Sequence, residues 1–212
     1  SDLITLQTGH FIRTMLRAVD ELRQALSVST RIVGVSKELI DSVTQDLYSL
    51  PEIEDRYRRL NVEEPYRLKA TAIRHKLVLT QRRHAAGAAH EYGRDYDSTA
   101  ELLEDLALMQ RSLMQHRGEL IAKGYLERII RTVSSFGITH ATMDVREHSD
   151  AHHHALSLLL GSAYESRTEA LTAQLSQGTK ADLAKLDADG LKTFNTFVAI
   201  RDLIDKFGPE VI

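Results

Sequence analysis

Residues Phe136 to Ser149 read FGITHATMDVREHS, and they indicate what kind of fold to expect. Gly137 follows an apolar helical stripe and is expected to end that helix, because glycine adopts a left-handed backbone at no steric cost. The residues after it are small or β-branched, which is typical of a short buried strand. Ser149 is expected to cap a further helix with its hydroxyl. Helix, strand, an arginine at the C-terminal end of the strand and a new helix are together typical of one unit of a β/α barrel.

The rest of the chain is predicted to be helical. Apolar residues recur at helical spacing in segments that begin near Ile4, Ser36, Pro65, Ser98, Leu126, Asp150 and Leu191. Ser36 and Ser98 are expected to be N-caps, and Glu101 occupies the capping-box position after Ser98. Pro51 suits the first turn of a short helix. The predicted secondary structure is mainly α-helical with one credible strand. This strand must pair with strands from outside residues 1–212.

The long helix that begins at Pro65 carries several basic residues. Lys76, Arg82 and Arg83 are predicted to be available to water, and Gly87 is expected to weaken the helix without ending it. The polar residues 90–97 are expected to form an exposed loop. A solvated face is therefore the default interpretation of this basic region.

Composition excludes several classes of function. The chain has 212 residues, of which 42% are hydrophobic and 27% charged, with a net charge of -3 and no cysteine. No apolar run approaches the length of a membrane span, and no basic stripe indicates nucleic-acid binding. A cytoplasmic protein without disulfides is expected. Both ends look cut, so residues 1–212 are expected to be one mainly helical segment of a larger protein.

Arg146 is the strongest candidate for a functional residue. Its guanidinium is always charged and offers a planar fork that pairs bidentately with phosphate or carboxylate. The alternative is a plain salt bridge to Asp144 or Glu147. Asp144 lies two residues earlier, so it either orients Arg146 or serves only as a structural hydrogen-bonding group.

Four histidines, at positions 148, 152, 153 and 154, suggest a metal site as an alternative. His148 and His152 are four residues apart and share a helical face. No third ligand is evident at helical spacing except acidic neighbours such as Asp150. We therefore predict no metal site in this chain.

The segment DVREHS, followed by His152, resembles the D-[IV]-R-Q-E-S-x-x-H motif of phosphoenolpyruvate carboxylase. The flanking sequences FG at 136–137, EPYR at 64–67 and FGPE at 207–210 are also similar to that family. Arg146, Ser149 and His152 match the motif. Glu147 and His148 replace the family's Gln and Glu, so no role is carried over to them.

The resemblance implies a piece of a helix-rich TIM-type barrel enzyme, with a barrel unit centred on 125–160. It implies a lyase that forms oxaloacetate and phosphate from phosphoenolpyruvate and bicarbonate, in carbon dioxide fixation that feeds the tricarboxylic acid cycle. Arg146 would contact the anionic substrate, Asp144 would support it, and His152 would hold its segment by hydrogen bonding. Magnesium, an allosteric homotetramer and a cytoplasmic location are further implications.

The same resemblance places other parts of the enzyme outside this chain. The metal ligands, the effector residues and an F-H-G-R-G-G loop are expected after Ile212, and a T-A-H-P-T segment before Ser1. The chain alone is therefore expected to be inactive. Two alternatives stand beside this interpretation: a non-catalytic helical scaffold or interaction module, and a helical metal-binding protein that uses the histidine cluster.

Overall fold

The computed structural model describes residues 2–26, 34–53, 55–140, 142–161, 167–178, 180 and 182–212. These residues form two compact units. The first comprises residues 1–142 and 206–211, and the second comprises residues 143–205 together with Ile212.

Helices make up both units, and the residues that the structure describes contain no strand. The first unit has α1 (Asp2–Ala25), α2 (Lys37–Ser49), α3 (Asp55–Leu60), α4 (Pro65–Ala86), α5 (Thr99–Gln115), α6 (Glu119–Ile121), the π-helical turn η1 (Ala122–Leu126) and α7 (Glu127–Phe136). The chain continues through α8 (Ser149–Leu160), α9 (Arg167–Gln177), the 3₁₀ turn η3 (Leu183–Lys185), α10 (Ala188–Phe207) and the 3₁₀ turn η4 (Pro209–Val211).

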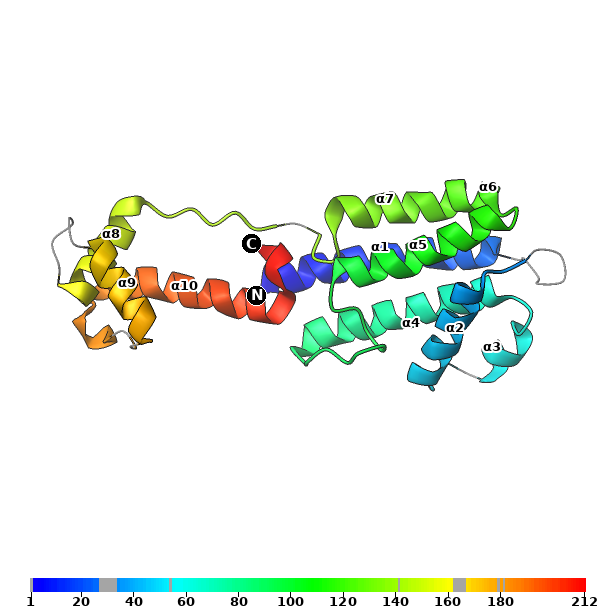
Figure 1. The fold of residues 1–212 in the computed structure, drawn as a ribbon, viewed down its shortest axis with the longest axis horizontal. Coiled ribbons are helices and arrows are strands. Elements are labelled where there is room, and N and C mark those ends of the chain that lie inside the picture. The colour runs from blue at the N-terminus through cyan, green and yellow to red at the C-terminus, as the bar shows by residue number, and fades with distance from the viewer. Residues whose placement is uncertain are drawn as a thin grey trace. The chain divides into compact units, whose positions relative to one another are not determined.

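The core of the first unit lies among α1, α4, α5 and α7, which run lengthwise beside one another (Figure 1). Gln81 on α4 donates to the carbonyl of Gly9, and Arg67 donates to the carbonyl of Arg23, so α1 and α4 are antiparallel. The predicted apolar stripes supply this core. Its buried members include Phe11, Met15, Val19, Leu22, Tyr66, Ile73, Leu77, Leu102, Leu106, Met109, Leu113, Leu126 and Val133.

Most of the predicted helix ends are confirmed. The hydroxyls of Ser36 and Ser98 accept from the backbone N–H groups of Leu39 and Glu101. Pro65 occupies the first turn of α4, and Gly161 ends α8 in the left-handed conformation. These caps depend on neighbours within one helical turn, which is why local sequence predicts them.

Other predicted helix ends are wrong. Gly87 ends α4 in the left-handed conformation, with φ of 64° and ψ of 30°. Pro51 lies in a turn that precedes α3. His148, rather than Ser149, caps α8, because its Nδ1 accepts from the backbone N–H of Asp150 at 3.3 Å. An imidazole nitrogen acts here as the acceptor that a hydroxyl was expected to supply.

The predicted strand after Gly137 is also wrong within the described residues; Ala141 lies outside them. Residues 137–140 form a turn, in which the N–H of Ile138 donates to the Thr99 hydroxyl at 3.1 Å. Residues 142–148 are neither helix nor strand, and most of them are exposed. A strand needs the backbone groups of a neighbouring strand as hydrogen-bond partners, and the described chain offers none.

Gly137 adopts a backbone that other residues strongly disfavour, with φ of 64° and ψ of 174°. It ends α7 as predicted, although its ψ differs from that of the left-handed helix. Gly137→Ala is expected to lower the free energy of unfolding by about 1–3 kcal/mol, because an L side chain strains this conformation. Urea unfolding followed by circular dichroism measures the change.

Gly124→Ala is the matched control for this substitution. No heavy atom lies within 4 Å of a Cβ added at Gly124, which is in a helical turn. The control should be neutral or slightly stabilising, because alanine favours a helix over glycine. Equal stability of the Gly137→Ala protein and the unaltered chain would contradict the strain at Gly137.

The second unit has a thin core. Its described buried side chains are those of Ala155 and Thr193, while Leu175 and Phe197 are exposed. Phe197 lies on the apolar face of α10 and Phe136 on that of α7, yet both side chains are exposed. Helical spacing correctly groups such residues on one face, but the neighbour that covers the face is set by tertiary packing.

Candidate functional site

Arg146 lies on the exposed segment between residues 142 and 148. Its Nε and one terminal nitrogen both contact Oδ2 of Asp144, at 2.7 Å and 2.6 Å. The Arg146 side chain is 88% exposed and that of Asp144 67% exposed. The two predicted residues are therefore brought together. This contact fits both an orienting role for Asp144 and a plain surface ion pair, which by itself contributes little to stability.

The histidines near the start of α8 have different partners. His148 caps the helix, and Nε2 of His154 lies 2.7 Å from Oδ2 of Asp187. The ring of His152 packs edge-on against Phe197 with centroids 5.3 Å apart. Its Nε2 is buried, and no hydrogen-bond partner for this atom is present among the described residues. The predicted role of His152 in holding the Arg146 segment stays a prediction.

A metal site needs three or more donors that converge on one point. Within the described residues, no three histidine or carboxylate side chains come together in this way. His148 and His154 lie beside different carboxylates: Nδ1 of His148 is 3.4 Å from Asp150, and Nε2 of His154 is 2.7 Å from Asp187. The alternative of a histidine-based metal centre therefore receives no support from the part of the chain that the structure describes.

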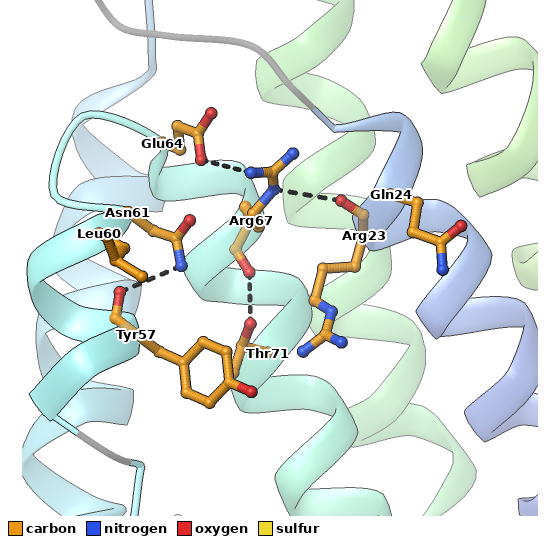
Figure 2. Close-up of a pocket in the computed structure, with 8 residues that line it drawn as sticks. All are labelled: Arg23, Gln24, Tyr57, Leu60, Asn61, Glu64, Arg67 and Thr71. Carbon is orange, nitrogen blue, oxygen red and sulfur yellow. Dashed lines mark hydrogen bonds and ion pairs between the residues drawn. The ribbon is translucent and has the colours of Figure 1, made fainter.

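A polar cavity of about 530 Å³ lies in the first unit, between the C-terminal end of α1, α3 and the start of α4 (Figure 2). Arg67, from the EPYR sequence, crosses its upper edge. One terminal nitrogen of Arg67 lies 2.8 Å from Glu64, and its Nε donates to the carbonyl of Arg23 at 3.3 Å. Arg67 thus fastens the start of α4 to the end of α1.

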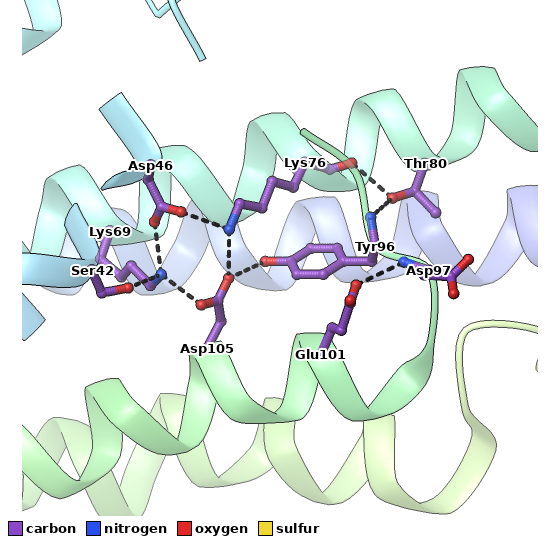
Figure 3. Close-up of polar contacts among 9 residues, drawn as sticks. All are labelled: Ser42, Asp46, Lys69, Lys76, Thr80, Tyr96, Asp97, Glu101 and Asp105. Carbon is purple, nitrogen blue, oxygen red and sulfur yellow. Dashed lines mark hydrogen bonds and ion pairs between the residues drawn. The ribbon is translucent and has the colours of Figure 1, made fainter. Parts of the chain in front are cut away.

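A buried network of charges joins α2, α4 and α5 (Figure 3). Lys69 contacts Asp46 at 2.7 Å and Asp105 at 2.6 Å, and Lys76 contacts the same two aspartates at 2.6 Å and 3.1 Å. The Lys69 side chain is fully buried. Two ammonium groups and two carboxylates therefore alternate around a neutral four-residue ring, called the lysine–aspartate quartet below.

Further hydrogen bonds complete the quartet. Ser42 on α2 accepts from Lys69 at 2.7 Å, and the Tyr96 hydroxyl donates to Asp105 at 2.8 Å. The backbone N–H of Tyr96 donates to Thr80 on α4. The loop after α4 is thereby tied to the quartet, so the prediction that residues 90–97 form an exposed loop is wrong for Asp95 and Tyr96, which are buried.

The contacts of the quartet shift the pKa values of Asp105, Lys76 and the adjacent Tyr96. Burial alone would raise the pKa of Asp105, but Lys69 and Lys76 together outweigh burial and hold that pKa below its ordinary value. Burial alone would lower the pKa of Lys76, and the two aspartates outweigh it, so the pKa of Lys76 is raised. Burial and the adjacent Asp105 raise the pKa of Tyr96 well above its ordinary value. All of these effects keep Lys76 and Asp105 charged and the Tyr96 phenol neutral at pH 7.

The quartet was not predicted from the sequence, and the prediction that Lys76 and Arg83 are exposed to water is wrong. Arg83 is largely buried, and its Nε lies 3.1 Å from Asp95. A signal was present: Lys69 and Lys76 are seven residues apart, a spacing that places both on one face of a helix. Tyr66, Ile73 and Thr80 are also buried on this helix. Lysines on an inward face indicate buried acidic partners, because a buried ammonium group needs one.

No helix among the described residues is both long enough and apolar enough to span a bilayer. The family model described as phosphoenolpyruvate carboxylase matches residues 1–212. The chain therefore belongs to the phosphoenolpyruvate carboxylase family, as its Arg146 motif predicted.

Individual relatives agree with the family match. The chain is 32% identical over 233 aligned residues to a phosphoenolpyruvate carboxylase from Roseiflexus castenholzii, with 99% of this chain and 25% of the relative covered. It is 28% identical over 222 residues to the carboxylase from Bradyrhizobium diazoefficiens, with 99% and 23% covered. The chain thus spans about a quarter of the length of these relatives.

Proposed function

We propose that this chain is a segment of a phosphoenolpyruvate carboxylase, which forms oxaloacetate and phosphate from phosphoenolpyruvate and bicarbonate. The observation that carries the proposal is the family match over residues 1–212. Alignment of 99% of the chain with about a quarter of each relative supports the view that other residues of the whole protein complete its active site.

The proposed reaction proceeds in two stages. The phosphoryl group first passes from the enol oxygen of phosphoenolpyruvate to bicarbonate, which gives carboxyphosphate and the enolate of pyruvate. Carboxyphosphate then breaks into carbon dioxide and phosphate, and the enolate carbon attacks carbon dioxide to form the new C–C bond. The protein has to hold a polyanion, balance its charge and keep water from the enolate.

Arg146 is the residue of this chain that we assign to substrate binding. Its fork matches the geometry of a phosphate or a carboxylate, and its exposed position leaves the guanidinium accessible to an incoming anion. Asp144 already contacts two nitrogens of that fork, so we assign it the supporting role of fixing the orientation of Arg146. His152 is assigned to holding the segment from the following helix.

The remaining properties are proposed from the family alone. They are a homotetramer under allosteric control, a cytoplasmic location and a barrel unit centred on 125–160, in which residues from the rest of the protein would supply neighbouring strands. Magnesium is the cofactor that the family implies. The described residues hold no group of donors that fits it, so no step is assigned to the metal here.

The gene on both sides of this segment provides the first test. A T-A-H-P-T sequence upstream and an F-H-G-R-G-G sequence downstream would support the carboxylase assignment. A stop codon directly after Ile212, with a start codon directly before Ser1, would contradict it and favour a helical scaffold.

A chimera provides the functional test. Residues 1–212 replace the matched quarter of the Roseiflexus castenholzii carboxylase, and oxaloacetate formation from phosphoenolpyruvate and bicarbonate is measured through a coupled assay. Turnover by the chimera is expected, and a carboxylase that lacks the segment serves as the blank. A chimera that assembles like its host but shows no turnover would count against the assignment.

The purified 212-residue chain is expected to show no carboxylase turnover above the blank. The physical reason is that Arg146 alone cannot neutralise a substrate with two anionic groups and shield the enolate from water. The same coupled assay checks this expectation, with the chimera as the positive control. Oxaloacetate formation by the isolated chain would overturn it.

A further inference from the structure

Residues 206–211 pack against the C-terminal end of α4 within the first unit. The ring of Phe207 lies 5.5 Å from the ring of His84, centroid to centroid, at an interplanar angle of 50°. His84 is 7% exposed and Phe207 is 5% exposed, and Val211 at the end of the segment is fully buried. His84 is therefore a titratable group inside the contact that holds this segment.

The hydrogen bonding around His84 fixes its protonation state. A terminal nitrogen of Arg83 lies 3.3 Å from Nε2 of His84. Because arginine carries only donors, Nε2 has to be the acceptor in this contact. The proton of the neutral ring is then on Nδ1, which is buried and has no hydrogen-bond partner among the described residues. An imidazolium would carry a proton on Nε2 too, and this N–H donor would face the N–H donor of Arg83.

The charges that face His84 favour the neutral ring as well. Burial first, and then the adjacent Arg83 and Lys206, lower the pKa of His84 to about 4, while Asp95 and Asp97 oppose the shift. Asp95 is already engaged, since Arg83 Nε lies 3.1 Å and His90 Nδ1 lies 2.6 Å from its Oδ1. Asp97 is mostly exposed. Neither carboxylate therefore outweighs burial and the two neighbouring cations.

We propose that His84 is a pH-sensitive latch for residues 206–211. The neutral imidazole holds the segment on α4 through its contact with Phe207. The imidazolium releases it, because a positive charge in this place would be buried beside Arg83 and Lys206 without an acceptor. The latch is carried by the contacts of His84 and does not depend on the proposed carboxylase function.

The size of the effect follows from proton linkage. A histidine whose pKa is lowered on docking binds fewer protons in the docked state, so docking is unaffected well above pH 6.5 and weakens as the pH falls below it. Arg83 lies on the same helix as His84 and stays beside the ring after release, so the pKa of the released ring is no higher than the ordinary 6.5. With a pKa of about 4 when docked, the docking equilibrium should weaken by up to about 30-fold between pH 7.5 and pH 5.

Hydrogen exchange of the 212-residue chain tests the latch. Protection factors for residues 206–211, corrected for the intrinsic effect of pH, are compared at pH 7.5 and pH 5. They should fall severalfold in the unaltered chain, and by no more than about 30-fold, the limit that linkage sets. His84→Phe keeps an aromatic ring against Phe207 and removes the titration, so its protection factors should not depend on pH. His75→Gln, on the same helix, is the matched control and should behave like the unaltered chain.

Two results would overturn the latch. One is equal protection of residues 206–211 at both pH values in the unaltered chain while α4 stays folded. The other is the same loss of protection in His84→Phe. If His84→Phe does not fold, a proton NMR titration replaces the test with this variant. It measures the pKa of the His84 ring in the unaltered chain and in Lys206→Gln. A depressed pKa that rises in Lys206→Gln supports the latch, and an ordinary pKa in both proteins contradicts it.

Discussion

Lys69→Met is expected to lower the free energy of unfolding of the first unit by about 3–5 kcal/mol, because it leaves a buried charge without its partner. Lys69 bridges Asp46 and Asp105 from a fully buried position. Without it, Lys76 alone faces two carboxylates that burial has removed from water. Methionine fills most of the volume of the lysine side chain, so the loss of stability comes from the missing charge and not from a cavity.

Urea unfolding at pH 7, with hydrogen exchange of α4 as the readout for the first unit, measures this loss. Arg74→Met is the matched control, because Arg74 pairs with Asp20 on the partly exposed side of the same helix and should contribute less than about 1 kcal/mol. The double variant Lys69→Met with Asp46→Leu removes one charge of each sign. Its free energy of unfolding should be higher than the sum of the losses in the two single variants predicts. If the free energy of unfolding of Lys69→Met equals that of the Arg74→Met control within experimental error, the quartet does not bind these helices together.

Arg146→Ala in the Roseiflexus chimera is expected to lower kcat/KM by about 100-fold or more, the scale of losing a charged donor aimed at a reacting anion. Arg146→Lys keeps the charge and loses the planar fork, so an intermediate loss is expected. The side chain is exposed in this chain, and either substitution should leave the stability of the chain unchanged. The assay is initial-rate kinetics with phosphoenolpyruvate as the varied substrate.

Arg131→Ala is the matched control for Arg146. Arg131 is an exposed arginine of α7 that pairs with Glu127 one turn away, and no role in substrate binding is assigned to it. Its substitution should leave kcat/KM within about twofold of the chimera, as expected for a surface ion pair. Unchanged kinetics in Arg146→Ala would remove Arg146 from the mechanism. Asp144→Asn, if Asp144 orients the fork, should produce a smaller loss than Arg146→Ala.

Local sequence predicts the helices and many of their ends. Apolar residues at helical spacing locate α1, α4, α5 and α7, and short-range caps such as Ser36 and Ser98 mark where helices begin. The Arg146 motif identifies the family before any tertiary contact is known. These features depend on residues within one or two helical turns of each other, and such residues are close in the sequence.

Partners distant in the sequence determine the rest. The residues between Gly137 and Arg146 have the composition of a strand, but those that the structure describes do not form one, because a strand exists only when neighbouring strands pair with its backbone. Lys69 and Lys76 are buried because Asp46 and Asp105, on two other helices, neutralise them. Sequence thus determines helices, caps and family membership, whereas only the tertiary structure decides which charges can be buried, since burial requires a partner that folding brings into contact.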